Sequence, residues 1–273
     1  MSDTAPTILP TYAAPPVKHR VFSLSAVIPA EVYYARADEL KEAMMAHFEH
    51  YEPQQQWLLN LEEKNGVPQF HSMKPEVLIM HTFWHKSPDG QKLVGCVVEP
   101  DKISIILRSV PKHVERFPTL KTWSEKIIPV WASLLTPKIS AAILDYANIL
   151  SRDTVPTFIN ENGSLAIGEL LTVFAGFPGE HQGIVPPYDC TMGLAIDPEA
   201  HIFLNLRVRG IQQHVSSGSA VQVDLQALKR PGKHGLTAAE AVDSLELLHK
   251  TVVDKFEVVF TPRAKAAFQP KTP

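Results

Sequence analysis

The stretch LTAAEAVDSLELLHKTVVDKFEVVF, residues 236–260, decides the expected fold of this chain. Thr237 and Glu240 stand three residues apart, which is the spacing of a capping box at the start of a helix. Apolar side chains and one histidine then recur every three or four residues, namely Val242, Leu245, His249, Val252, Phe256 and Val259. This pattern predicts a helix of about six turns with one apolar stripe. The stripe needs a surface to cover, and strand-like runs just before it can provide one.

Two similar sets of strands are predicted, each followed by a long helix. The set before residue 236 comprises strands at 188–196, 201–209 and 221–228. The other set comprises strands at 76–85, 92–98 and 102–108, with Ser87-Pro88-Asp89-Gly90 as the turn of a hairpin. It precedes a helix predicted over residues 117–135, which contains Pro129. Both sets therefore favour antiparallel sheet with helices on one face.

Each set is also preceded by a strand and a helix. These are predicted at 17–29 and 38–51 in the first case, and at 138–150 and 167–174 in the second. Both halves thus have the order strand, helix, three strands, long helix, with little residue identity between them. The fold class that follows is α+β, an antiparallel sheet with helices on one face and two pseudo-repeated halves.

The same order predicts the domain organisation. It gives a flexible N-terminal segment at 1–16, a first α+β half at 17–136, a second α+β half at 137–262 and a C-terminal tail at 263–273. Within the first half, residues 52–69 are predicted to form an irregular excursion with a short strand at 56–61. The halves can form one continuous sheet or two separate lobes, and the sequence leaves both open.

Composition narrows the range of functions. The formal charge of -3 and the pI of about 6.5 argue against a general polyanion binder, so nucleic-acid binding is not favoured. No apolar run approaches the roughly 18 residues that a membrane-spanning helix needs. Cys96 and Cys190 are far apart in strand-like runs and are expected to be reduced thiols. We therefore expect a soluble, cytoplasmic protein without membrane insertion.

Five residues are candidates for ligand binding. Tyr146 and Asn148 share one face of the strand at 138–150, opposite Asp145. Asn205, Arg207 and Arg209 line one face of the strand at 202–209 and can receive a carboxylate or a phosphate. The alternatives are a structural hydrogen-bond network for the first pair and a solvent-facing sheet surface for the second group.

Catalytic, metal-binding and cofactor-binding motifs are not evident. His81 and His85 would lie about 13 Å apart on one strand face, too far to share a metal ion. His47 and His50 have helical spacing but no identifiable third ligand. The glycine-rich residues 176–183 lack the Lys-Ser/Thr pair of a phosphate-binding loop. The sequence thus predicts no catalytic residue, no metal and no cofactor.

Several segments, in order, are similar to those of a known family. They are Pro15-Pro16-Val17, the strand at 98–108, Phe117-Pro118-Thr119-Leu120, the strand segment Leu144–Ile149, and the C-terminal helix with His249, Phe256 and Thr261. Together they resemble the TIGR-catalogued "sporadically distributed" family of prokaryotic proteins over about residues 15–268. Asp145 stands where that family usually has arginine. The resemblance implies a prokaryotic protein but no activity, because the family's function is unknown.

The functional expectation follows from a well-patterned fold without a convergent set of catalytic groups. We expect a non-enzymatic cytoplasmic protein that binds a protein partner or builds an assembly, with a homo-oligomer as one form. The alternative is a small-ligand-binding protein or enzyme with a cavity between the sheet and the C-terminal helix. Tyr146, Asn148 or Arg207 would reach that cavity.

Overall fold

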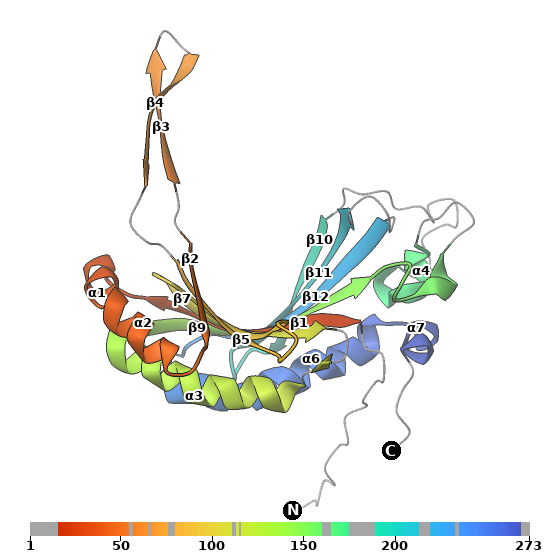
Figure 1. The fold of residues 1–273 in the computed structure, drawn as a ribbon. Helices are drawn as coiled ribbons and strands as arrows, with labels where there is room; N and C mark the ends of the chain where they lie inside the picture. Colours follow the sequence, from red (N-terminus) through yellow and green to blue (C-terminus); the bar gives the residue numbers. More distant parts are fainter. Residues whose placement is uncertain are drawn as a thin grey trace, which may run out of the picture. The chain divides into compact units, whose positions relative to one another are not determined.

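The computed structural model combines antiparallel sheet with helices packed on it, which confirms the α+β prediction (Figure 1). It describes residues 16–54, 57–64, 67–75, 80–110, 113–114, 116–159, 165–174, 189–212, 219–232 and 235–268. The chain divides into two compact units. The N-terminal unit consists of Val21–Ala142 and Arg230–Asp243, and the C-terminal unit consists of Met1–Arg20, Ile143–Lys229 and Ser244–Pro273.

In the N-terminal unit the strands follow the order β9-β1-β7-β6-β5-β2. They are β1 (Val17–Val27), β2 (His50–Gln54), β5 (Met80–Lys86), β6 (Lys92–Glu99), β7 (Lys102–Val110) and β9 (Lys138–Leu150). β3 (Trp57–Lys64) and β4 (Val67–Pro75) form a separate two-stranded sheet, and β8 (His113–Val114) pairs with β7. The predicted turn joins β5 to β6, and Gly90 adopts the positive φ of 81° that favours glycine there.

The helices of this unit are α1 (Ala30–Ala35), α2 (Ala37–Met45), α3 (Phe117–Leu135) and α5 (Ala238–Asp243). α3 has the predicted bounds because Pro118 suits its first turn and Thr136 ends it in the left-handed conformation, with φ 43°. It packs on β7, α2 and α5. Leu120, Ile127 and Trp131 of its predicted stripe are fully buried.

Two predictions for residues 38–69 were wrong. The helix predicted to reach residue 51 ends at Met45, because the chain then turns and pairs with β5 as β2, with Tyr51 opposite Phe83. The short strand predicted at 56–61 is present as β3, but the rest of the excursion predicted at 52–69 is not irregular, because it contains the end of β2 and the start of β4. Pairing with a distant strand overrides local helical spacing here. Residues 76–79 of the next predicted strand lie outside the described residues.

In the C-terminal unit the strand order is β10-β11-β12-β9-β1. The additional strands are β10 (Asp189–Asp197), β11 (Ile202–Gln212) and β12 (Ser219–Lys229). The helices are α4 (Ile167–Leu170), α6 (Leu245–Val259) and α7 (Pro262–Ala267), with 3₁₀ turns η1 (Pro156–Phe158) and η2 (Thr172–Phe174). α6 packs on β12 and β11, and Leu248, Val252 and Phe256 of its apolar side are buried.

The single helix predicted over 236–260 was wrong, although its start and its stripe were confirmed. α5 ends at Asp243 and α6 begins at Leu245, with the buried Ser244 between them. The capping box is present because the Thr237 N–H donates to Glu240 Oε2 at 2.8 Å and the Glu240 N–H donates to Thr237 Oγ1 at 3.2 Å. No helix in the described ranges has both the length and the apolar composition needed to cross a bilayer.

The helix predicted over 167–174 is also interrupted. α4 ends at Leu170 because Leu171 forms a bridge with Phe260, and the 3₁₀ turn η2 follows. The order of elements in the two halves resembles the predicted repeat, but internal duplication itself stays a prediction. The glycine-rich residues 176–183 lie outside the described residues.

Candidate functional site

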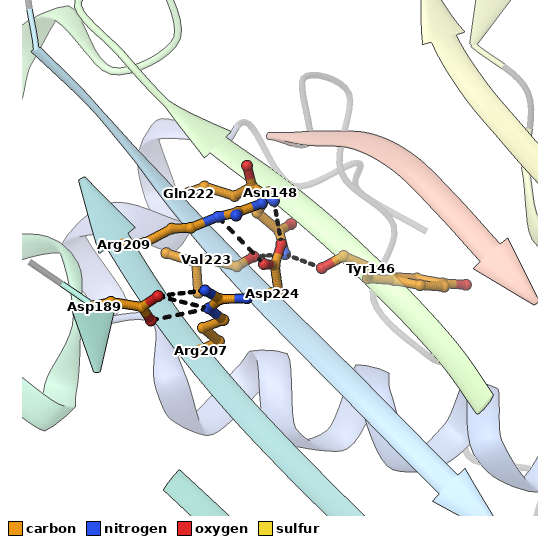
Figure 2. A network of polar contacts seen from close by, with 8 residues as sticks. All are labelled: Tyr146, Asn148, Asp189, Arg207, Arg209, Gln222, Val223 and Asp224. Atoms are coloured by element: carbon orange, nitrogen blue, oxygen red, sulfur yellow. Dashed lines mark hydrogen bonds and ion pairs between the residues drawn. The ribbon is translucent and has the colours of Figure 1, made fainter. Parts of the chain in front are cut away.

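One face of the sheet in the C-terminal unit carries a cluster of polar side chains (Figure 2). Side chains alternate along a strand, so residues opposite each other in register share a face. Arg207 of β11 pairs with Thr191 of β10 and with Asp224 of β12, so their side chains share a face. The buried Leu206 and Val208 alternate with Arg207 and lie on the face that α6 covers. We call the other face the polar face, and it carries Asp145, Asp189, Asn205, Arg207, Arg209, Gln222, Asp224 and Gln226.

Arg207 forms a bidentate ion pair with Asp189 of the outermost strand, β10. Its Nε donates to both carboxylate oxygens of Asp189, at 2.9 and 3.1 Å, and a terminal guanidinium nitrogen also donates to Oδ2. These hydrogen bonds lower the pKa of the Asp189 carboxyl. Both side chains are nearly half exposed, at 45% and 46%. Exposed ion pairs contribute little stability, so this pair chiefly fixes where the guanidinium points.

Asp224 is the buried carboxylate at the centre of the polar face. Gln222 Nε2 donates to its Oδ1 at 2.7 Å, and Arg209 Nε lies 3.9 Å from its Oδ2. At the next cross-strand pair on the same face, Asn205 Nδ2 donates to Gln226 Oε1 at 3.1 Å. Amide and guanidinium groups therefore hold the inner part of the polar face in a fixed arrangement.

Asp145 brings a second carboxyl to the same cluster from β9. Burial raises the pKa of Asp145 to about 7, and the nearby charge of Asp224 adds to this, while a hydrogen bond from Gln226 and the charge of Arg209 oppose it. Its Oδ1 atom is buried and has no hydrogen-bond partner within the described ranges. The carboxyl can therefore exchange a proton close to neutral pH.

Tyr146 and Asn148 lie on the opposite face of the sheet, which α6 covers. The Tyr146 hydroxyl lies 2.8 Å from His249 Nδ1 of α6, and the Arg20 guanidinium lies 5.3 Å from the Tyr146 ring centroid. Asn148 Nδ2 donates to the backbone oxygens of Tyr146 and Val223, both at 3.0 Å (Figure 2). Burial lowers the pKa of His249 to about 4 and raises that of Tyr146, so both are neutral at pH 7.

The five predicted ligand-binding residues therefore do not form one site. Asn205, Arg207 and Arg209 share a face as predicted, whereas Tyr146 and Asn148 lie on the other side of the sheet. Arg207 was predicted as one residue that could reach a cavity under the C-terminal helix. It lies on the face of the sheet away from α6, so this prediction was wrong. The ligand-binding role of all five stays a prediction.

Sequence reasoning missed part of the polar face. The alternation Gln222, Asp224, Gln226 within the predicted strand at 221–228 could have identified three of its members. Asp189 had no such signal, because its pairing with Arg207 depends on the register between β10 and β11.

Among the described strands of this unit, β10 is the outermost and pairs with β11 alone, along one of its edges. Met192 and Leu194 stand opposite Leu206 and Leu204, on the side of the sheet that α6 covers over β11 and β12. Leu204 and Leu206 are almost fully buried, whereas Met192 and Leu194 are 36% and 49% exposed. A register shift after Ala195 ends the regular part of the strand. Asp189–Ala195 is therefore a regular edge with an uncovered apolar side.

β2 is the outermost strand of the N-terminal unit and differs from β10. It carries Pro53, which has no N–H, and Glu52, whose carboxylate accepts a hydrogen bond from Lys92 Nζ at 2.6 Å. Its Tyr51 hydroxyl lies 3.0 Å from His81 Nδ1, and Lys41 Nζ lies 5.0 Å from the Tyr51 ring centroid.

The histidines considered as metal ligands have other contacts. His85 Nδ1 lies 2.8 Å from Glu49 Oε1, and His81 contacts Tyr51 as described above. His47 follows α2 and His50 begins β2, so these two do not share a helix face. No group of three or more His, Cys, Asp and Glu side chains in the described part of the chain could hold a metal ion.

No family model, curated protein or solved structure matches this chain. The resemblance to the "sporadically distributed" family therefore stays a prediction. Function has to follow from the residues and contacts described above.

Proposed function

We propose that this chain is a protein-binding protein whose partner adds a strand to the free edge of β10. The observation that carries the proposal is the regular edge Asp189–Ala195 with Met192 and Leu194 exposed beside buried leucines. Edge strands present a row of backbone donors and acceptors to solvent, and partner strands use such rows for recognition. The edge Asp189–Ala195 contains neither proline nor lysine, the residues that often prevent such pairing.

The apolar side of β10 adds a second source of affinity. A partner strand with apolar residues at alternate positions would remove the remaining exposed surface of Met192 and Leu194 from water. Since each of these side chains is already more than half buried, the gain is about 1 kcal/mol for each. The alternating pattern also fixes the register, because a shift by one residue would place polar groups on the apolar side.

The polar face supplies selectivity at one end of the same edge. The Arg207 guanidinium extends toward β10, where it is bound by Asp189 and still 45% exposed. An acidic side chain of a partner strand could share this guanidinium, whose five N–H groups exceed what one carboxylate can use. Such contacts mainly affect which partner binds and how fast it associates.

The alternative of a ligand cavity under α6 has weaker support. The apolar side of α6 is buried, and Tyr146, which was expected to reach a cavity, is bound to His249 instead. An enzyme would also need a set of catalytic groups around an accessible space. The closest candidate, Asp145, has its free carboxyl oxygen buried.

The test compares three tagged proteins purified from the native host, with co-eluting proteins identified and quantified by mass spectrometry. They are the wild type, Leu194→Lys on β10, and the control Leu247→Lys on α6. The control has a matched exposure, because Leu247 is 45% and Leu194 49% exposed. We expect the wild type and the control to retain one stoichiometric partner, either another protein or the untagged native chain, and we expect Leu194→Lys to lose it. Equal recovery of every protein by Leu194→Lys would overturn the proposal.

A further inference from the structure

We propose that the strand added to β10 is the β10 strand of a second copy of this chain, paired antiparallel about a two-fold axis at Met192. The inference rests on the proposed function and names its partner. Three features of the β10 edge carry it: its length, the sizes of its side chains and its charge.

Within the described residues, the regular part of the edge runs from Asp189 to Ala195, and its central residue is Met192. An isologous contact presents the same surface patch on both copies, and the patch must therefore complement itself. Antiparallel pairing centred on Met192 uses the whole regular edge of both copies. It also keeps the apolar sides of both strands on the same side of the joined sheet, because opposite residues then share a face.

Side-chain sizes fit this register. On the apolar side, Leu194 of each copy lies opposite Cys190 of the other copy, and the two Met192 side chains meet at the axis. On the polar side, Thr191 lies opposite Gly193 and Asp189 lies opposite Ala195. Each non-identical pair thus joins a larger side chain to a smaller one. Methionine suits the axis because its flexible side chain adapts to an identical neighbour.

The charges along the edge permit the same pairing. Asp189 is the one charged residue in Asp189–Ala195, and Arg207 of the same chain neutralises it. In the two-fold register it lies opposite Ala195, so like charges do not meet across the new strand pair. The formal charge of -3 for the whole chain is too small to oppose association of two copies at physiological ionic strength.

The experiment uses purified full-length protein and exploits the position of Met192 on the axis. Met192→Lys places two lysines opposite each other in a homodimer, and Met192→Glu places two glutamates there. Both changes are tolerable for folding because Met192 is 36% exposed, and circular dichroism will check this. Masses are measured over a concentration series by size-exclusion chromatography with light scattering.

We expect wild type and the Leu247→Lys control to approach twice the 30.3 kDa mass of one chain as concentration rises. Met192→Lys and Met192→Glu should each remain at the mass of one chain. An equimolar mixture of the two should regain the doubled mass, and native mass spectrometry should find one copy of each variant in it. This rescue is specific for a register in which Met192 meets itself.

Three results would overturn the inference: a wild type that stays monomeric at every concentration, a dimer that Met192→Lys does not weaken, or a mixture that fails to form the mixed dimer. They are distinguishable from failure of the proposed function. If the wild type is monomeric but retains a different protein that Leu194→Lys loses, the partner is not a second copy of this chain, and the proposed protein-binding function stands.

Discussion

β2 and β10 are the outermost strands of their units, yet their exposed edges have opposite character. β2 contains Pro53 and a Glu52 side chain bound to Lys92, and proline and charge are common means of preventing unwanted strand pairing. Over Asp189–Ala195, β10 exposes Met192 and Leu194 and contains no proline, and its one charged residue, Asp189, stands at the end of this range. One chain therefore protects one edge and leaves the other available, which is why we propose β10 as the binding edge.

The largest effect is expected from removing the protection of β2. Glu52→Val combined with Pro53→Val restores an N–H and replaces the ion pair with an apolar side chain, so the β2 edge becomes open to pairing. In a Met192→Lys background, which is expected to be monomeric, light scattering should now detect concentration-dependent association. Glu52→Gln with Pro53 retained is the control and should stay monomeric. If the double change at β2 leaves the mass unchanged, proline and charge do not explain the difference between the edges.

Two carboxyl groups, Glu52 on the edge strand β2 and Asp145 on the interior strand β9, should respond to pH in opposite directions. Hydrogen bonding to Lys92 is the main cause that lowers the pKa of Glu52, so its contribution to stability is lost as the pH falls. Asp145 has a raised pKa of about 7 against an ordinary value of 3.8, so the unfolded chain releases this proton first. Asp145 therefore lowers the free energy of unfolding progressively as the pH rises from about 4 to about 7.

Asp145→Asn should therefore remove a pH-dependent loss of stability. We expect the variant to gain about 3 kcal/mol relative to wild type between pH 5 and pH 8, since about two pH units of the shifted window lie in this range and each corresponds to about 1.4 kcal/mol. Urea unfolding at the two pH values measures the gain. Glu52→Gln, the same kind of change on the edge strand β2, should show no such gain. A constant difference between Asp145→Asn and wild type at both pH values would contradict the assignment.

A smaller effect is expected from the tyrosine–histidine pair in each unit. Tyr146 is 5% exposed and bound to His249, whereas Tyr51 is only partly buried beside His81. Loss of the hydroxyl leaves a polar partner unsatisfied, and this costs more in a buried site. Tyr146→Phe should lower the free energy of unfolding by about 1–2 kcal/mol, and Tyr51→Phe by about half as much or less. Equal losses in urea unfolding would show that burial does not separate the two pairs.

Local sequence patterns predicted the fold wherever neighbouring residues determine the structure. α3 was predicted with the right bounds, because proline and a regular apolar stripe define it locally. The capping box at Thr237 was predicted for the same reason. β2 was missed because its conformation depends on pairing with β5, some 30 residues later in the chain. The division between α5 and α6 was missed because the apolar stripe continues through Ser244.

The candidate site was predictable only in part. Alternation along β11 placed Asn205, Arg207 and Arg209 on one face, which the structure confirmed. Neither the contact between Arg207 and Asp189 nor the proximity of Asp145 to Asp224 could be predicted, because both depend on register between strands. The edge position of β10 likewise depends on strand order, which a single sequence does not reveal.

The way the chain is shared between the two units bears on its synthesis. The C-terminal unit needs the start of β1 as well as α6, and the N-terminal unit needs residues 230–243 as well as everything from β2 to α3. A ribosome must therefore deliver most of the chain before either unit has all its parts, and β1 has to wait for partners made much later. Such long-range closure slows folding and leaves apolar strands exposed to other chains in the meantime. Cutting the gene between residues 136 and 137 would accordingly yield two incomplete fragments rather than two small proteins.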